Sequence, residues 1–190
     1  MSEWNSLGLW TGWTDVSLAP EGVAEAKAVG VALAAYPIHS AHVSELKRTH
    51  ETFAGIKEGF GKDIPVRRDA ALNERHYGAY TGKNKWEIKK EVGDAAFDAM
   101  RRGWDVPIPD GETLRAVCER AAPYYETNIL PELQAGKSVL VVAHGNTIRA
   151  LIKHIERISP EDIASVEVGT GEIVAYQATD GGMVRLSSLV

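Results

Sequence analysis

A histidine that directly follows a strongly apolar run is the residue best placed to do chemistry in this sequence. The run Val139–Ala143 is continuous and β-branched, which predicts a strand buried on both faces, and it stops at His144-Gly145-Asn146, where a helical pattern begins. In open α/β sheets, ligands bind at the carboxyl ends of the strands, and the start of a helix offers backbone N–H groups suited to an anion. The stretch predicts a phosphate site, although a strand-to-helix turn with an incidental histidine fits it equally well.

A second polar and aromatic block spans residues 72–78 and reads Leu-Asn-Glu-Arg-His-Tyr-Gly. This composition suits a binding loop better than a linker, which would favour Ser, Pro and small residues. Arg48 falls in the first turn of a predicted helix, and a solvated surface arginine is the competing interpretation. The formal charge is −5, so an anion site must be a local cluster of cations in an acidic protein, and nucleic-acid binding is disfavoured.

The elements that must position these residues alternate along the chain. Helical spacing and capping residues predict helices over about 20–36, 46–60, 84–102, 112–133 and 148–155, and a short one from Ser159. Apolar runs predict strands at Ala41–Val43, at Ile64–Val66 on an edge, at Val139–Ala143, at Ile173–Tyr176 and at Met183–Leu186. This alternation predicts an α/β fold, a three-layer α/β/α sandwich with a largely parallel sheet. Residues 72–110 depart from the alternation and would serve as a lid over the ligand edge.

Composition predicts one soluble globular domain over residues 1–190. The chain is 44% hydrophobic and 25% charged, which is ordinary for such a domain. Its single cysteine, Cys118, excludes an internal disulfide framework and a thiolate zinc cluster, which favours a reducing cytoplasm. No apolar run approaches the roughly 18–20 residues needed to span a bilayer, so neither a membrane nor export is expected.

Taken together, the motifs resemble those of the histidine phosphatase superfamily and, within it, the 2,3-bisphosphoglycerate-dependent phosphoglycerate mutases. The matching pieces run in the family's order over nearly the whole chain: Ser2-Glu3-Trp4-Asn5, Trp10-Thr11-Gly12-Trp13-Thr14-Asp15, Ser44-Glu45-Leu46-Lys47-Arg48, Leu72-Asn73-Glu74-Arg75-His76-Tyr77-Gly78, Gly82-Lys83-Asn84-Lys85, Arg101-Arg102 and Ala143-His144-Gly145-Asn146. The block at 72–78 together with Thr11-Gly12-Trp13 is specific to the mutase branch.

The resemblance implies interconversion of 2-phosphoglycerate and 3-phosphoglycerate in glycolysis and gluconeogenesis, through a phosphohistidine enzyme. It implies 2,3-bisphosphoglycerate as the priming phosphoryl donor and no metal, because arginines and histidine do the work of a divalent cation. Glu74 would be the proton donor and acceptor, and His144 would stabilise the transferring phosphoryl group. The substrate shell would consist of Asn5, Thr11, Gly12, Arg48, Arg75, Tyr77, Lys85, Arg101, Arg102, Gly145 and Asn146. Four histidines, His39, His42, His50 and His154, match no catalytic piece, and His76 is expected to support its loop.

One departure from the family pattern concerns the nucleophile. Family members begin with a buried apolar strand ending in Arg-His-Gly-x-Ser-Glu-Trp-Asn, whose histidine is phosphorylated, and here Met1 occupies the x position. The resemblance implies that the first, central strand and the nucleophile lie upstream of Met1, so the 190-residue chain is expected to fold poorly and to lack turnover. The alternatives are a broad-specificity histidine phosphatase and a catalytically silent phosphate-ligand-binding protein. A homodimer is compatible with the sequence, which does not fix the oligomeric state.

Overall fold

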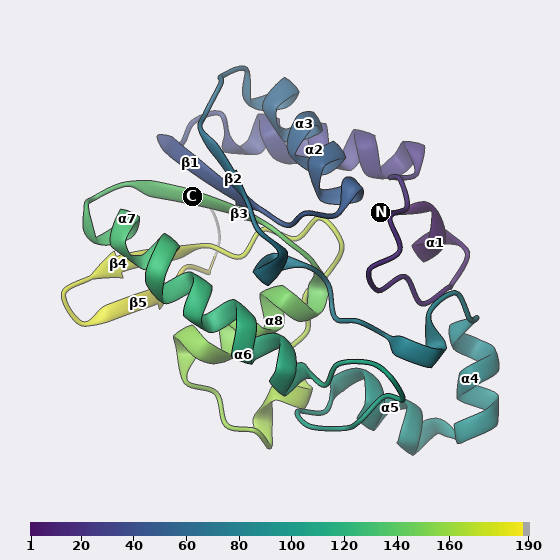
Figure 1. Cartoon of the computed structure of the whole chain (residues 1–190). Helices are drawn as coiled ribbons and strands as arrows, with labels where there is room; N and C mark the ends of the chain where they lie inside the picture. The colour runs from purple at the N-terminus through teal and green to yellow at the C-terminus, as the bar shows by residue number, and fades with distance from the viewer. Residues whose placement is uncertain (188–190) are drawn as a thin grey trace.

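A parallel sheet lies at the centre of the computed structural model, which describes residues 1–187 of the chain. Within those residues the sheet has three strands in the order β2-β1-β3, formed by β1 (Ile38–Val43), β2 (Val66–Arg68) and β3 (Ser138–Val142) (Figure 1). Val43 lies opposite Val142 in the register of β1 and β3. The carboxyl ends of these two strands are therefore level, and Ser44 and His144 emerge at the same edge of the sheet.

Helices cover both faces of the sheet, as the predicted three-layer sandwich requires. On one face, α2 (Pro20–Leu33) and α3 (Lys47–Phe60) pack against a core that includes Val43 and Val142. On the other face, α6 (Leu114–Tyr124) and α8 (Gly145–Glu156) pack with Val139 and Val141. Alternate residues of β3 thus point into different layers, which is the period-two pattern of a strand.

Glycines bring α2 and α3 into backbone contact. A Cβ atom on Gly30 would lie 2.1 Å from the carbonyl oxygen of Ile56, and one on Gly59 would lie 2.1 Å from that of Lys27. No side chain fits at either position, so the close crossing of the two helices depends on these residues.

The lid region has a small core of its own. It contains α4 (Lys85–Val92), α5 (Asp94–Arg102) and two single 3₁₀ turns, Ala70–Leu72 and Gly78–Tyr80. The buried side chains of this core are Tyr77, Ile88, Phe97, Met100 and Ile108 of the lid, together with Trp10 from the N-terminal segment. The single helix predicted over 84–102 was wrong, because Gly93 adopts φ +84° and ends one helix before the next begins.

The predicted helix over 112–133 is present with a change of geometry in its middle. Its α-helical part α6 gives way to a π-helical segment at Tyr125–Ile129, which is followed by α7 (Leu130–Gln134). Pro123 lies inside α6 and Pro131 near the start of α7. Neither proline can donate an i→i−4 hydrogen bond, and the helix widens between them.

The remaining elements differ from the prediction mainly at their bounds. The C-terminal strands are β4 (Tyr176–Thr179) and β5 (Gly182–Arg185), an antiparallel hairpin separate from the main sheet. The edge strand β2 begins at Val66 rather than Ile64, and the short last helix is a 3₁₀ turn at Asp162–Ser165. A four-residue helix α1 (Glu3–Ser6) had no signal in the sequence.

Strand β3 is less buried than its composition predicts. Four of its residues are half-buried and only Val142 is fully buried, because β3 has no second partner strand among the described residues. Within residues 1–187, no helix combines the length and the apolar character that crossing a membrane requires.

Candidate active site

Predicted site residues gather at one end of a cavity of about 650 Å³ that runs along β3. They come from segments far apart in the sequence, and those that line the cavity are Asn5, Thr11, Arg48, Glu74, Tyr77, Lys85, His144 and Gly145. This end of the cavity lies at the carboxyl ends of β1 and β3, where parallel sheets bind ligands.

His144 occupies the position directly before α8, with the extended backbone of an N-cap residue. Its Nε2 lies 2.8 Å from Oγ of Ser44, the residue that follows β1. Burial, and then the positive charges of Arg48 and Arg120, lower the pKa of His144 well below its usual value of 6.5. The imidazole is therefore neutral at neutral pH.

A chain of hydroxyl groups continues from this histidine. Ser44 Oγ lies 2.7 Å from Thr49 Oγ1, which in turn donates to the carbonyl oxygen of Leu46 at 2.7 Å. Because the proton of Thr49 is used in that bond, Ser44 donates to Thr49 and can accept a hydrogen bond from His144. We assign the neutral ring with its proton on Nε2, since this tautomer satisfies every member of the chain.

Arg48 lies in the first turn of α3, and its side chain is buried. The guanidinium donates to the carbonyl oxygens of Gly12 at 2.8 Å and Thr14 at 3.1 Å. The interpretation of Arg48 as a solvated surface arginine was wrong, because the 11–15 loop folds over it. Asp15 strengthens this closure by accepting from the backbone N–H of Lys47 at 2.6 Å.

Glu74 follows the 3₁₀ turn at 70–72 and lines the cavity. Its carboxylate accepts a hydrogen bond from the backbone N–H of Arg75 at 2.7 Å. Its carbonyl oxygen accepts from Trp13 Nε1 at 2.5 Å and from Arg120 Nη2 at 3.0 Å. The backbone of this residue is thus held from two directions.

The lid contributes an aromatic and cationic wall. Tyr77 is buried, its ring lies 4.4 Å from that of Trp10, and its hydroxyl accepts from Asn146 Nδ2 at 2.8 Å. Lys85 Nζ lies 5.7 Å from the Trp10 ring, and burial together with the charge of Arg101 lowers the pKa of Lys85. The Tyr77–Asn146 bond connects the lid directly to the start of α8.

Three of the predicted arginines lie outside the cavity lining. Arg75 is fully buried and donates to the carbonyl oxygens of Glu112 at 2.6 Å and Met100 at 2.9 Å. Arg102 forms an ion pair with Glu167 at 2.6 Å, while Arg101 lies over the ring of Phe97. A contact between these arginines and a ligand stays a prediction.

Gly12 also contributes through its backbone. Its carbonyl oxygen accepts from Arg48, and its φ of +53° belongs to the left-handed region that favours glycine. A Cβ atom there would lie 3.2 Å from the backbone nitrogen of Tyr77. The loop can approach the 72–78 block this closely only because residue 12 is a glycine.

Two arginines around the site have no counterpart in the sequence-based prediction. Arg120 donates to the carboxylate of Glu112 and to backbone carbonyls near Glu74. Arg149 is buried and donates to the carbonyl oxygens of Arg102, Ile163 and Val166 at 2.8–2.9 Å. Each lies within the apolar stripe of its helix, and a cation at such a position is the signal that could have found them.

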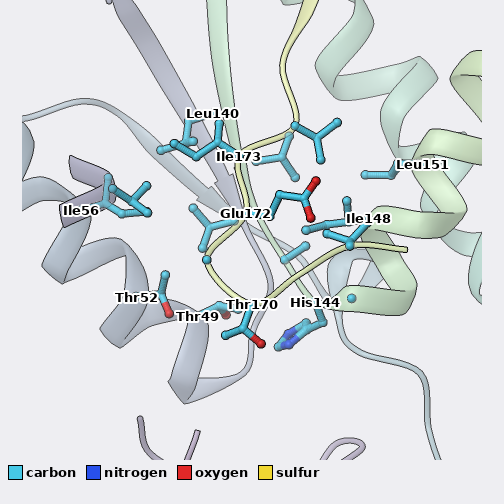
Figure 2. A pocket seen from close by; sticks show the side chains of 18 of the residues that line it. Thr49, Thr52, Ile56, Leu140, His144, Ile148, Leu151, Thr170, Glu172 and Ile173 are labelled. Carbon is cyan, nitrogen blue, oxygen red and sulfur yellow. The ribbon is translucent and has the colours of Figure 1, made fainter. Parts of the chain in front are cut away.

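Away from His144, the cavity is an apolar slot between β3 and the segment 168–176. Figure 2 shows Ile56 and Leu140 on one side, Ile148 and Leu151 on the other, and Glu172 and Ile173 on the segment that crosses it. His144 and Thr170 lie together at one end of this slot (Figure 2). The polar site and the apolar slot are therefore parts of one cavity. Among residues 1–187, no group of three or more His, Cys, Asp or Glu side chains could hold a metal ion.

The sequence matches the model of the histidine phosphatase superfamily (branch 1) over residues 1–188. The 2,3-bisphosphoglycerate-dependent phosphoglycerate mutase of Cytophaga hutchinsonii is 46% identical over 176 residues, which cover 93% of this chain and 83% of that protein. The protein of the same name from Parvibaculum lavamentivorans is 38% identical over 193 residues, covering 100% of this chain and 92% of the relative.

Solved structures agree with this match at the level of the fold. The complex of a mycobacterial glucosyl-3-phosphoglycerate phosphatase with VO3 superposes with a TM-score of 0.85 at 22% identity, over 98% of this chain and 92% of that one. Bacillus stearothermophilus YhfR superposes with a TM-score of 0.83 at 24% identity, over 97% of this chain and 90% of that one. The chain belongs to the histidine phosphatase superfamily, branch 1.

Proposed function

We propose that this protein interconverts 2-phosphoglycerate and 3-phosphoglycerate through a phosphohistidine, with 2,3-bisphosphoglycerate as the priming phosphoryl donor. The observation that carries the proposal is the convergence of Arg48, Glu74, Lys85 and His144 at one end of a single cavity. The names of the relatives that are 38–46% identical support the same reaction. A glycolytic role would place the protein in the cytoplasm.

Each of these groups has a part that follows from its chemistry. Phosphoryl transfer needs charge neutralisation around the phosphorus oxygens and an acid and base for the substrate oxygens. Arg48 and Lys85 would supply the positive charge, and Glu74 would give and take the proton of the substrate hydroxyl. The backbone N–H of Gly145 at the start of α8 would donate to a phosphoryl oxygen, and the charge of the bound anion would favour protonation of the neighbouring His144 ring, whose Nδ1–H would then donate as well.

The lid would close this site. Residues 72–110 pack around the core that contains Trp10 and Tyr77, and the Tyr77–Asn146 hydrogen bond joins that core to α8. Arg101 and Arg102 stand at the end of α5, where a small shift of the lid would turn them toward a bound anion. Exclusion of water by such a closure would favour transfer to a sugar acid over transfer to water.

The phosphoryl-accepting histidine would come from an additional strand outside the 190-residue sequence. His144 already has its own place, and the other five histidines do not line the cavity. The apolar slot beside β3 supports this part of the proposal, because an extended segment lying there would find the open edge of β3 and would end next to His144 and Arg48.

The test compares the 190-residue chain with the same chain preceded by an apolar strand ending in Arg-His-Gly, here called the extended chain. Interconversion is measured with 3-phosphoglycerate, with and without 2,3-bisphosphoglycerate. We expect only the extended chain to show turnover, and we expect this turnover to depend on 2,3-bisphosphoglycerate. The extended chain should also unfold at a higher temperature than the 190-residue chain. Glu74→Gln in the extended chain should lower turnover by about 10²–10⁴-fold, the usual contribution of a general acid or base.

Each alternative gives a different result in this assay. Turnover by the 190-residue chain would refute the assignment of the nucleophile to an added strand. Release of inorganic phosphate without interconversion would identify a phosphatase. Binding without either reaction in the extended chain would identify a silent phosphate-ligand-binding protein.

A further inference from the structure

Arg120 makes an unusual set of contacts for a residue in the middle of a helix. Its guanidinium donates to three backbone carbonyl oxygens, those of Ala71 at 2.9 Å, Asn73 at 2.9 Å and Glu74 at 3.0 Å. All three belong to the short stretch that carries the Glu74 side chain into the cavity. A single cation from α6 therefore fixes the backbone of this stretch.

Glu112 holds the guanidinium in the orientation that these bonds need. Its two carboxylate oxygens accept from Arg120 Nε at 2.8 Å and from Nη2 at 2.9 Å, a bidentate pair in which both side chains are about one-fifth exposed. One of these oxygens also accepts from the backbone N–H of His76 at 2.8 Å. The ion pair thus grips the chain on both sides of Glu74, at residues 71–74 and at residue 76.

A third contact converges on the same carbonyl. Trp13 Nε1 donates to the carbonyl oxygen of Glu74, and the Arg120 guanidinium lies 6.0 Å from the Trp13 ring. The Trp13 indole therefore reports on the position of that carbonyl. The bond to the Glu74 carbonyl oxygen brings the charge of Arg120 close to the site, where it contributes to the lowered pKa of His144.

We infer that Arg120 and Glu112 are positioning residues that hold Glu74 in place for proton transfer in the proposed reaction. Neither residue lines the cavity, so each acts through Glu74 and not on the substrate. That the pair holds the Glu74 backbone in place rests on hydrogen-bond geometry alone. That this matters for proton transfer rests on the proposed function.

The first experiment measures local order in the 190-residue chain, or in the extended chain where the 190-residue chain does not fold. In Arg120→Met, we expect amide hydrogen exchange of residues 72–78 to accelerate about tenfold or more, the scale of one lost charge-assisted hydrogen bond. The indole N–H resonance of Trp13, assigned with Trp13→Phe, should shift as well. Arg120→Lys keeps one donor group and should give an intermediate result.

The matched control is Arg115→Met. Arg115 lies in the same helix and pairs with Glu119 and Asp105 at the exposed surface, without a hydrogen bond to the 71–76 stretch among the described residues. This variant should leave the Trp13 resonance and the exchange of residues 72–78 unchanged. Equal behaviour of Arg120→Met and Arg115→Met would overturn the inference.

A milder variant covers the case in which Arg120→Met does not fold. Glu112→Gln keeps the shape of the side chain and removes its charge, so it should loosen residues 72–78 less than Arg120→Met does. Unchanged hydrogen exchange and an unchanged Trp13 resonance in Glu112→Gln would contradict a positioning role for the Arg120–Glu112 pair.

The second experiment measures catalysis in the extended chain. Arg120→Met and Glu112→Gln should lower kcat about tenfold or more while KM changes little, because the ligand-contacting cations are retained. Arg120→Lys should recover part of the kcat, and Arg115→Met should retain all of it. A rise in KM at constant kcat would refute a positioning role. Absence of turnover from the unmutated extended chain would refute the proposed function alone, since the exchange experiment stands without it.

Discussion

Arg48 shows how one residue can serve both the fold and the site. Its two backbone bonds close the 11–15 loop over α3, and its charge faces Glu74 and His144. A buried cation of this kind costs free energy unless it is fully paired, and an anion bound in the proposed function would supply a further partner. In the proposed function, this positive charge would be in place before a phosphate binds.

Replacement of Arg48 should therefore weaken both the closure of the 11–15 loop and the binding of an anion. In Arg48→Met, we expect the affinity for inorganic phosphate, measured by calorimetry, to fall by about 10–150-fold, which corresponds to one charge-assisted hydrogen bond of about 1.5–3 kcal/mol. Arg67→Met removes an exposed arginine whose partner is Asn128, and it should leave phosphate binding unchanged. Similar affinities in both variants would show that Arg48 does not face the ligand.

The sequence motifs predicted which residues belong to the site, but they did not predict the burial and the hydrogen-bond partners of those residues. The order of the motifs was enough to bring Glu74, Lys85 and His144 to one predicted site. The burial of Arg48 could not be predicted, because it depends on a loop 34 residues earlier in the chain. Arg120 was missed for a similar reason, since its partners at 71–74 are 46–49 residues away and leave no local pattern.

At the scale of elements, the contact between α2 and α3 sets the layer that supports Arg48. The two helices touch through their backbones at Gly30 and Gly59, so they have no room to approach each other more closely, and α3 carries Arg48 in its first turn. Glycine lowers helix propensity by about 1 kcal/mol relative to alanine, which the close packing must offset.

Gly30→Ala should therefore destabilise the protein in spite of its better helix propensity. We expect the free energy of unfolding to fall by about 1–3 kcal/mol, the usual cost of overpacking a close contact. Urea denaturation measures this change. Val31→Ala, at an exposed position next to it in α2, should stay within about 0.5 kcal/mol. An increased free energy of unfolding in Gly30→Ala would contradict the close backbone contact between α2 and α3.

Elements with strong local sequence signals could be predicted. The errors occur where contacts with distant residues or the backbone conformation determine the bounds of an element. The cores of β1, α2, α3 and α8 follow from periodicity and capping alone. The break at Gly93 depends on a backbone conformation that the sequence allows without requiring. The strand expected at Ile173–Tyr176 begins instead at Tyr176, because pairing with β5 determines where β4 starts.

At the scale of the whole molecule, two buried histidines connect stability to pH. Burial lowers the pKa of His42, and burial with the charges of Arg48 and Arg120 lowers that of His144. His42 is satisfied as a neutral ring, with Nδ1 2.8 Å from the hydroxyl of Tyr124 and Nε2 3.3 Å from Glu132. Below pH 6.5 the unfolded chain therefore binds protons at these two residues more readily than the folded chain does.

The free energy of unfolding should consequently fall as the pH drops below about 6.5. Each histidine contributes a slope of up to about 1.4 kcal/mol per pH unit. Urea denaturation at pH 7.5, 6.5 and 5.5 measures this slope. It should be shallower in His42→Gln than in the unmutated chain. An equal slope in His42→Gln would show that His42 is protonated in the folded state.

The origin of the site in widely separated segments has a consequence for folding. Residues near 5, 11, 48, 74, 85 and 144 meet at one end of the cavity, so an anion bound there would contact parts of the chain that come together only in the native state. A ligand at 100 times its dissociation constant adds about 2.7 kcal/mol to the stability of the state that binds it. The metabolite would then act as a tether between the loop at 11–15, the lid and α8, and its concentration in the cell would set how much of the protein is kept intact.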